Sequence, residues 1–190
     1  MAERVKNMRQ LLIEAGIEEI NRVGVAEFSV RRVAQACGVS CAAPYKHFKD
    51  KREFIAAIIE FVNEQWATRQ EEILSRCGDD LREQIVEMVV EYLRFLMEKP
   101  WFRSILTLKD AQFDNLYHKA RGQMSSRSQR LEAAFFEESG WDREKMHRKL
   151  HIVRAILFGT VFLIETGELI FDEEVLEHVR SAVDREFDLP

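Results

Sequence analysis

The sequence is poor in cysteine, proline and glycine, and each shortage narrows the possible fold. Only three cysteines occur in 190 residues, an odd number that argues against a secreted scaffold held by disulfides. Three prolines and eight glycines leave long stretches uninterrupted. The alternating runs of Val, Ile and Thr that would indicate strands are also missing. The sequence therefore predicts an all-helical protein of about nine helices.

Long hydrophobic runs are missing as well. The most apolar stretch, residues 155–164, is about half as long as the roughly 20 residues that a membrane-spanning helix needs. The beginning of the chain lacks the apolar core of a secretory signal. We therefore expect a cytoplasmic protein that does not associate with a membrane.

The charge is unevenly distributed along the chain. The formal net charge is −5, but residues 1–52 alone have a balance of +4 and the remaining residues one of −9. Because an acidic protein repels nucleic acid as a whole, its basic end is the one region suited to contact with phosphates. This distribution points to the first 52 residues as a candidate DNA-binding domain.

Residues 28–51 have the pattern of two short helices joined by a tight turn. Ser29 is placed to cap the first helix, and Gly38 is placed to end it. A second helix of about two turns is predicted from Cys41 to Phe48, with Tyr45 and Phe48 as its buried anchors. This arrangement is typical of a helix-turn-helix motif, whose exposed second helix enters the major groove of DNA.

The motif resembles that of the TetR family of bacterial transcriptional regulators. The matching positions are Gly24, Ser29, Val33-Ala34, Gly38-Val39-Ser40, Tyr45-Lys46-His47-Phe48 and Lys51. The resemblance implies an N-terminal three-helix DNA-binding domain, residues 1–52, and a C-terminal helical domain for effector binding and dimerisation, residues 53–190. The alternative is a helix-turn-helix that serves the structure alone. Pro44 departs from the family, which usually has Leu there.

The motif also identifies candidate DNA-binding residues. They are Ser29, Arg31, Ser40, Cys41, Ala42, Ala43, Tyr45, Lys46, His47 and Lys51. Arg31 and Lys46 are our candidates for contact with base edges, whereas Ser29, Tyr45, His47 and Lys51 are expected to contact phosphates. Arg4 and Lys6 are expected to add phosphate or minor-groove contacts.

Caps and apolar periodicity predict the helices outside the motif. Their approximate ranges are 6–23, 51–76, 80–96, 100–108, 110–139, 143–167 and 172–187. The helix over 143–167 is apolar nearly all round from residue 155 to residue 164, so it needs partners on two sides. It is predicted to form a homodimer interface with the last helix, as the resemblance implies; the alternative is the centre of a monomer's core. The interface residues would be Ile156, Gly159, Thr160, Leu163, Val179 and Val183.

The resemblance further implies a pocket for a small-molecule effector. Aromatic residues that could line it are Trp66, Tyr92, Trp101, Phe113, Tyr117, Phe135, Phe158 and Phe162. Each of them would also suit an ordinary core. The predicted function is a ligand-responsive transcriptional regulator, a repressor that binds a palindromic operator as a homodimer and is released by an apolar or aromatic effector. The alternative is a helical small-molecule-binding protein that has lost DNA binding.

Signs of catalysis or of a cofactor are weak. His147 and His151 have the i, i+4 spacing of metal ligands, but no Cys or carboxylate clearly joins them. Gly-rich phosphate loops, a nucleophile elbow and paired-carboxylate motifs are missing. We therefore expect no enzyme activity, no cofactor and no metal.

Overall fold

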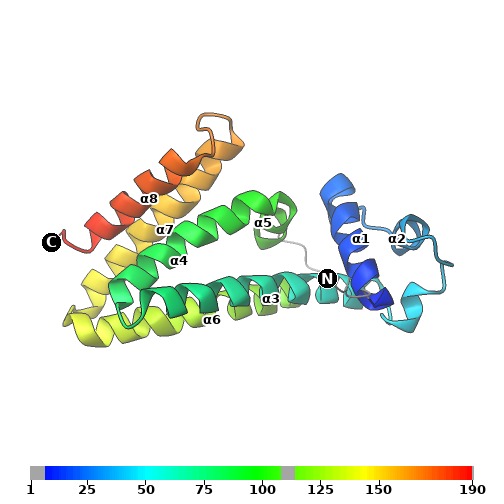
Figure 1. Cartoon of the computed structure of the whole chain (residues 1–190), viewed down its shortest axis with the longest axis horizontal. Helices are drawn as coiled ribbons and strands as arrows, with labels where there is room; N and C mark the ends of the chain where they lie inside the picture. The colour runs from blue at the N-terminus through cyan, green and yellow to red at the C-terminus, as the bar shows by residue number, and fades with distance from the viewer. Residues whose placement is uncertain (1–6, 108–113, 190) are drawn as a thin grey trace, which may run out of the picture. The chain divides into compact units, whose positions relative to one another are not determined.

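The computed structural model describes residues 7–107 and 114–189, which form α-helices and one 3₁₀ turn (Figure 1). In chain order the helices are α1 (Met8–Val23), α2 (Val30–Ala36), the turn η1 (Pro44–Lys46), α3 (Lys51–Cys77), α4 (Leu81–Glu98), α5 (Pro100–Thr107), α6 (Asp114–Ser139), α7 (Arg143–Glu165) and α8 (Glu173–Glu186). The all-α prediction is confirmed. No helix in these ranges has the length and apolar character to cross a bilayer.

The predicted helix starts follow from aspartate caps. Asp80, Asp142 and Asp172 each accept a hydrogen bond from the backbone N–H three residues on, at 2.9, 2.7 and 2.9 Å. Such a bond satisfies one of the amides that the first turn of a helix leaves unpaired. The starts of α4, α7 and α8 were therefore predictable to within a residue.

The chain divides into two compact units. The first comprises residues 1–65 and 100–123, and the second comprises residues 66–99 and 124–190. Helix α3 is continuous and contributes residues to both. The predicted domain boundary after residue 52 falls in the first turn of α3 and stays a prediction.

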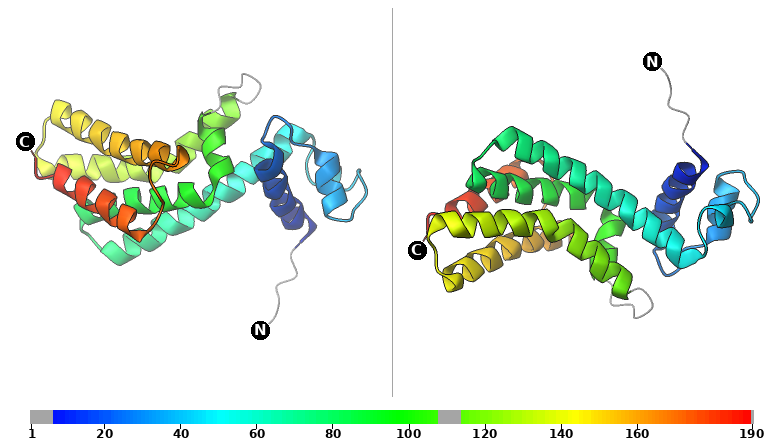
Figure 2. Two further views of the ribbon diagram at one scale, coloured as in Figure 1. Left: turned by 90° about the horizontal axis from the view of Figure 1, so that it is seen from above. Right: turned by 90° about the horizontal axis from the view of Figure 1, so that it is seen from below.

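In the first unit, α1 crosses the beginning of α3 (Figure 2). The crossing is close because a Cβ atom at Gly16 would lie only 2.7 Å from Cδ1 of Ile58. Beside it, the Phe54 ring stacks on Phe48 at 4.1 Å and meets Phe28 edge-on at 5.4 Å. All three rings are buried. This aromatic cluster joins the loop before α2, the segment after η1 and the start of α3 into one core.

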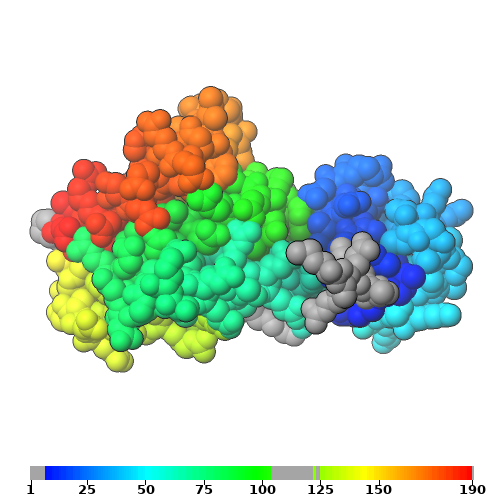
Figure 3. Space-filling model, viewed as in Figure 1, coloured from blue at the N-terminus to red at the C-terminus, as the bar shows by residue number. Residues whose placement is uncertain are grey.

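In the second unit, α8 packs along α4 and α7 (Figures 1 and 3). Arg82 of α4 holds the end of α8, because its guanidinium donates to Asp184 Oδ1 at 2.7 Å and to Asp188 Oδ1 at 2.6 Å. Hydrogen bonds from both carboxylates raise the pKa of Arg82. The last helix is therefore tied to α4 by charge as well as by its apolar face.

A buried carboxylate fixes α2 against α1. Glu19 is only 7 % exposed and accepts from Arg22 at 2.7 Å and from Arg32 Nε at 2.5 Å. Arg32 also donates to the Glu27 carbonyl. Burial alone would raise the pKa of Glu19, but the hydrogen bonds and charges of the two arginines outweigh it and lower the pKa. Sequence reasoning missed this residue, although its position on the inward side of α1 with Leu12 and Gly16 was a usable signal.

We expect Glu19→Gln to destabilise the protein by about 1–2 kcal/mol at pH 7, because two charge-assisted hydrogen bonds are weakened. The folded-state pKa is lower than the ordinary value of 4.5, so the ionised form contributes stability above that pH. The contribution is lost as the pH falls below 4.5 through the folded-state pKa. Urea unfolding of both proteins between pH 7 and pH 4 measures the difference. Glu18→Gln, at an exposed neighbour, is the control, and an equal loss in both variants would contradict the assignment.

Candidate nucleic-acid interface

The first helix of the motif forms as predicted. Ser29 caps α2, and its hydroxyl accepts from the Arg32 amide at 3.4 Å. After α2, Gly38 has φ +67°, a left-handed conformation that suits glycine in the turn. The cap and the turn place Arg31 on the exposed side of α2.

The predicted helix over residues 41–48 is wrong. This segment forms successive three-residue turns, in which the Ala43 amide donates to Ser40, the Lys46 amide to Ala43 and the His47 amide to Pro44. An α-helix would need an N–H at position 44 to donate to the Ser40 carbonyl, and proline has none. Pro44 therefore converts the recognition element into a short 3₁₀ segment.

The anchoring side chains of this segment also differ from prediction. Phe48 is buried as expected, but Tyr45 is 57 % exposed and the Pro44 ring takes the inward position. A 3₁₀ turn has three residues per turn and not 3.6, so neighbouring positions rotate relative to an α-helix. The Tyr45 ring is thereby free to contact a ligand.

The predicted DNA-binding residues lie close together in sequence and mostly on the surface. Arg31, Ser40, Cys41, Ala42, Tyr45, Lys46 and His47 are exposed, whereas Ser29, Ala43 and Lys51 are half-buried. Within the part of the chain that the structure describes, no ion pair engages Arg31 or Lys46. Arg4 and Lys6 lie outside the described residues. The surface has small side chains at its centre and unpaired cations beside them, which suits contact with a polyanion.

Lys51 has a structural partner that sequence reasoning missed. Its ammonium donates to the Ala26 carbonyl at 3.1 Å, which ties the loop before α2 to the start of α3. Asp50 caps α3 by accepting from the Glu53 amide at 2.8 Å, and Glu53 in turn accepts from the Lys49 amide at 2.7 Å. This reciprocal arrangement resembles a capping box and was readable from the Asp50–Glu53 spacing.

The aromatic residues predicted for an effector pocket do not converge on one place. In the second unit, Trp66 lies 5.0 Å from Tyr92 and 5.2 Å from Phe95. Burial raises the pKa of Tyr92 to about 12. In the same unit, Phe135 packs on Trp141 and Phe187 at 5.3 and 5.1 Å. These are two separate aromatic clusters.

The other predicted pocket residues lie elsewhere. Trp101 is buried in the first unit, 5.6 Å from Phe102. Phe158 and Phe162 are 51 % and 60 % exposed on α7. Phe113 and the side chain of Tyr117 fall outside the described residues.

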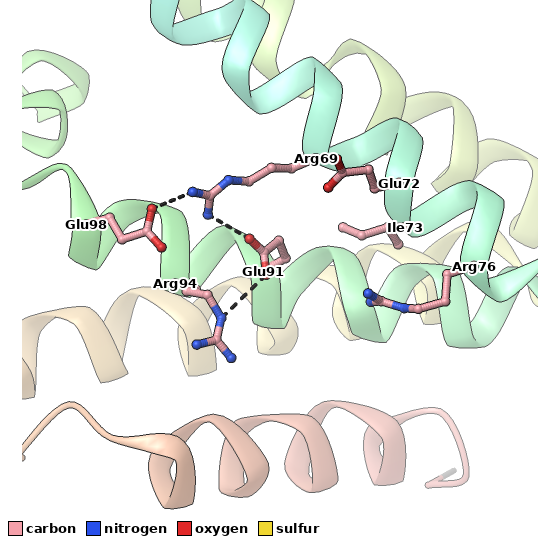
Figure 4. A pocket seen from close by; sticks show the side chains of 7 residues that line it. All are labelled: Arg69, Glu72, Ile73, Arg76, Glu91, Arg94 and Glu98. Atoms are coloured by element: carbon pink, nitrogen blue, oxygen red, sulfur yellow. Dashed lines mark hydrogen bonds and ion pairs between the residues drawn. The ribbon is translucent and has the colours of Figure 1, made fainter. Parts of the chain in front are cut away.

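One cavity in the second unit lies between α3 and α4 and is charged. It has a volume of about 320 Å³ and is lined by Arg69, Glu72, Ile73, Arg76, Glu91, Arg94 and Glu98 (Figure 4). Arg69 reaches across it to Glu91 at 2.7 Å and to Glu98 at 2.5 Å. Each of these arms crosses from α3 to α4. The lining joins the two helices by ion pairs and differs in chemistry from an apolar effector site.

The predicted dimer residues divide into two groups. Val179 and Val183 of α8 are buried within the chain, where α8 packs on α4 and α7. Gly159 and Leu163 are exposed on α7, and Ile156 and Thr160 are half-buried. The surface left for another molecule is therefore on α7.

The comparisons with known proteins agree with this geometry. Residues 12–58 match the family model described as "Bacterial regulatory proteins, tetR family". The chain is 28 % identical over 134 residues to the nucleoid occlusion factor SlmA of Aliivibrio fischeri, a match that covers 70 % of this chain and 66 % of the relative. The match thus spans slightly less than two thirds of that relative's length.

Solved structures share the fold over nearly the whole chain. A TetR transcriptional regulator from Legionella pneumophila superimposes with a TM-score of 0.68 at 18 % identity, covering 96 % of this chain and 98 % of that one. The transcriptional regulator FadR from Bacillus subtilis, in complex with stearoyl-CoA, gives a TM-score of 0.68 at 15 % identity, with 96 % and 97 % covered. By its N-terminal domain and its fold, the chain is a member of the tetR family of bacterial regulatory proteins, which are transcriptional regulators and not enzymes.

Proposed function

We propose that the protein is a homodimeric repressor that binds a palindromic DNA operator and is released by a small apolar or aromatic effector. The observation that carries the proposal is the exposed surface around η1, where Arg31 and Lys46 have no ion pair in the described part of the chain. Unpaired cations beside small side chains favour phosphate and base contacts over protein packing.

The chemistry of this surface indicates how DNA would be recognised. Cys41, Ala42 and Ala43 offer little hydrogen bonding to base edges, so direct base contacts fall to Arg31 and Lys46. Tyr45, exposed by the 3₁₀ turn, and His47 are placed for phosphates. Lys51 holds the Ala26 carbonyl with one N–H and keeps two others for a phosphate. With so few direct donors, the shape of the DNA contributes to specificity.

Homodimerisation is supported by an exposed apolar stripe on α7. The stripe consists of Ala155, Phe158, Gly159, Phe162 and Leu163, which share one side of the helix at spacings of three and four residues. A Cβ atom at Gly159 would meet nothing within 4 Å in the chain. A glycine inside a helix costs about 1 kcal/mol relative to alanine, and no contact within this chain requires it. Close approach of a second α7 gives that glycine a role.

The effector is proposed to bind the second unit and to act through α3. That helix carries Trp66 and the ion-pairing Arg69 in the second unit, and Phe54 and Ile58 in the core that supports the motif. FadR of Bacillus subtilis was solved with stearoyl-CoA, so acyl-CoA thioesters are the first effectors to test. A ligand can shift the protein between two conformations only by its difference in affinity for them.

Selection of random duplex DNA on the purified protein, followed by titration at two salt concentrations, tests DNA binding. We expect a palindrome to be enriched and its affinity to fall steeply with salt. Arg31→Ala and Lys46→Ala should each weaken binding by about 1–3 kcal/mol, roughly tenfold or more, because each removes a base contact. The control is Arg130→Ala, at an exposed position of α6.

Failure to enrich any sequence with a folded, dimeric protein would contradict the repressor and favour a ligand-binding protein that has lost DNA binding. Equal losses in all three arginine and lysine variants would instead contradict the assigned residues. Addition of acyl-CoA thioesters to the protein–DNA complex then tests the effector, whose expected result is release of the DNA.

Gly159→Leu tests the dimer interface. A leucine side chain has open space within one chain and improves helix propensity, so the folded monomer should be at least as stable as before. In the dimer the same side chain separates the two helices, and we expect the dissociation constant to rise at least tenfold. Sedimentation velocity over a concentration series measures it. An unchanged dimer with Gly159→Leu would place the interface elsewhere.

A role in nucleoid occlusion is the second candidate, because the matched relative carries that name and the match extends beyond the DNA-binding domain. Deletion of the gene separates the two candidates. Altered transcription next to the selected operator supports the repressor, whereas division over the nucleoid without such a change supports the second role.

A further inference from the structure

The exposed side of α7 carries opposite charges at its two ends. Arg148 and Arg154 are exposed before the apolar stripe, and Glu165 and Glu168 are exposed after it. The middle of the stripe falls at Phe158 and Gly159. Arg148 lies ten residues before Phe158 and Glu168 lies ten residues after it, about 15 Å along the axis in each direction.

From this charge pattern we propose that the partner on α7 is a second copy held in antiparallel orientation, with Arg148 of each copy facing Glu168 of the other. The inference rests on the proposed homodimer and adds its orientation and register. In a two-fold interface the same surface meets itself, so a residue before the axis meets one after it when the helices are antiparallel.

The antiparallel register makes every charge near the interface complementary. Arg148 meets Glu168, and Arg154 lies within two residues of the position opposite Glu165. Glu144, in the first turn, then lies beyond the end of the partner's α7. A parallel pair would place Arg148 against Arg148 and Glu165 against Glu165, and like charges across an interface are repulsive. The same pattern discriminates against partners whose interface helix lacks an acidic C-terminal end.

Existing contacts leave these groups accessible for such pairing. Arg154 makes an ion pair with Glu132 of α6 at 3.2 Å, yet its side chain is 58 % exposed. Glu168 accepts from the Thr166 hydroxyl at 3.0 Å, just after the Gly167 turn that ends α7. That turn holds Glu168 at the end of the helix, because its amide donates to the Leu163 carbonyl at 2.9 Å.

Charge reversal tests the register. We expect Arg148→Glu and Glu168→Lys each to weaken the dimer about tenfold, because each creates two repulsive pairs per dimer. The double variant R148E/E168K should return to within about threefold of the original affinity, since the attraction is restored with its signs exchanged. Sedimentation velocity at low salt measures all three. Arg130→Glu and Glu137→Lys, on the exposed side of α6, are matched controls.

Other outcomes overturn the proposal in distinguishable ways. If Gly159→Leu dissociates the dimer but the single reversals do not, or if the double variant is weaker than both, the antiparallel register is wrong and the proposed dimer stands. If neither Gly159→Leu nor the reversals change the dimer, both the interface and the register are wrong.

Discussion

Helix α3 is the constraint on which the rest of the structure depends, because one continuous helix supplies buried side chains to both compact units. Near its beginning, Phe54 stacks on Phe48 and closes the core beneath the helix-turn-helix. In its second half, Trp66 packs among aromatic side chains, and Arg69 makes two ion pairs with α4. A helix is stiff along its axis, so a displacement of one part is carried to the other. Any effector acting on the second unit has this route to the DNA-binding surface.

The helices were predictable because their ends have strong local chemistry. An aspartate with a free carboxylate, as at Asp80 and Asp172, competes well for the first amides of a helix, and the apolar spacing that follows confirms the direction. The prediction failed over residues 41–48, where the motif pattern outweighed the effect of one residue. Pro44 removes a donor and changes the turn, and this exchanges the orientations of Pro44 and Tyr45.

The aromatic pocket could not be predicted from the sequence for a different reason. A Phe or Trp in an apolar stripe says that a side chain is covered, but not by which element. Phe135 meets Trp141 and Phe187 at the end of α8, while Trp66 meets Tyr92. Phe158 and Phe162 are covered by nothing in their own chain. Their apolar surroundings in the sequence reflect an interface and not an interior, and only three-dimensional contacts separate the two.

The exposed rings on α7 link the second unit to operator recognition. An isolated recognition surface with two unpaired cations and few base-edge donors has limited affinity and specificity, since each contact contributes only about 1–3 kcal/mol. Two copies related by a two-fold axis double the contacts and add the requirement of half-site spacing. An interface centred on Gly159 and Phe162, whose register is set by charge, would define that spacing. The weak direct readout expected from Cys41, Ala42 and Ala43 is therefore a reason for the protein to depend on its dimer.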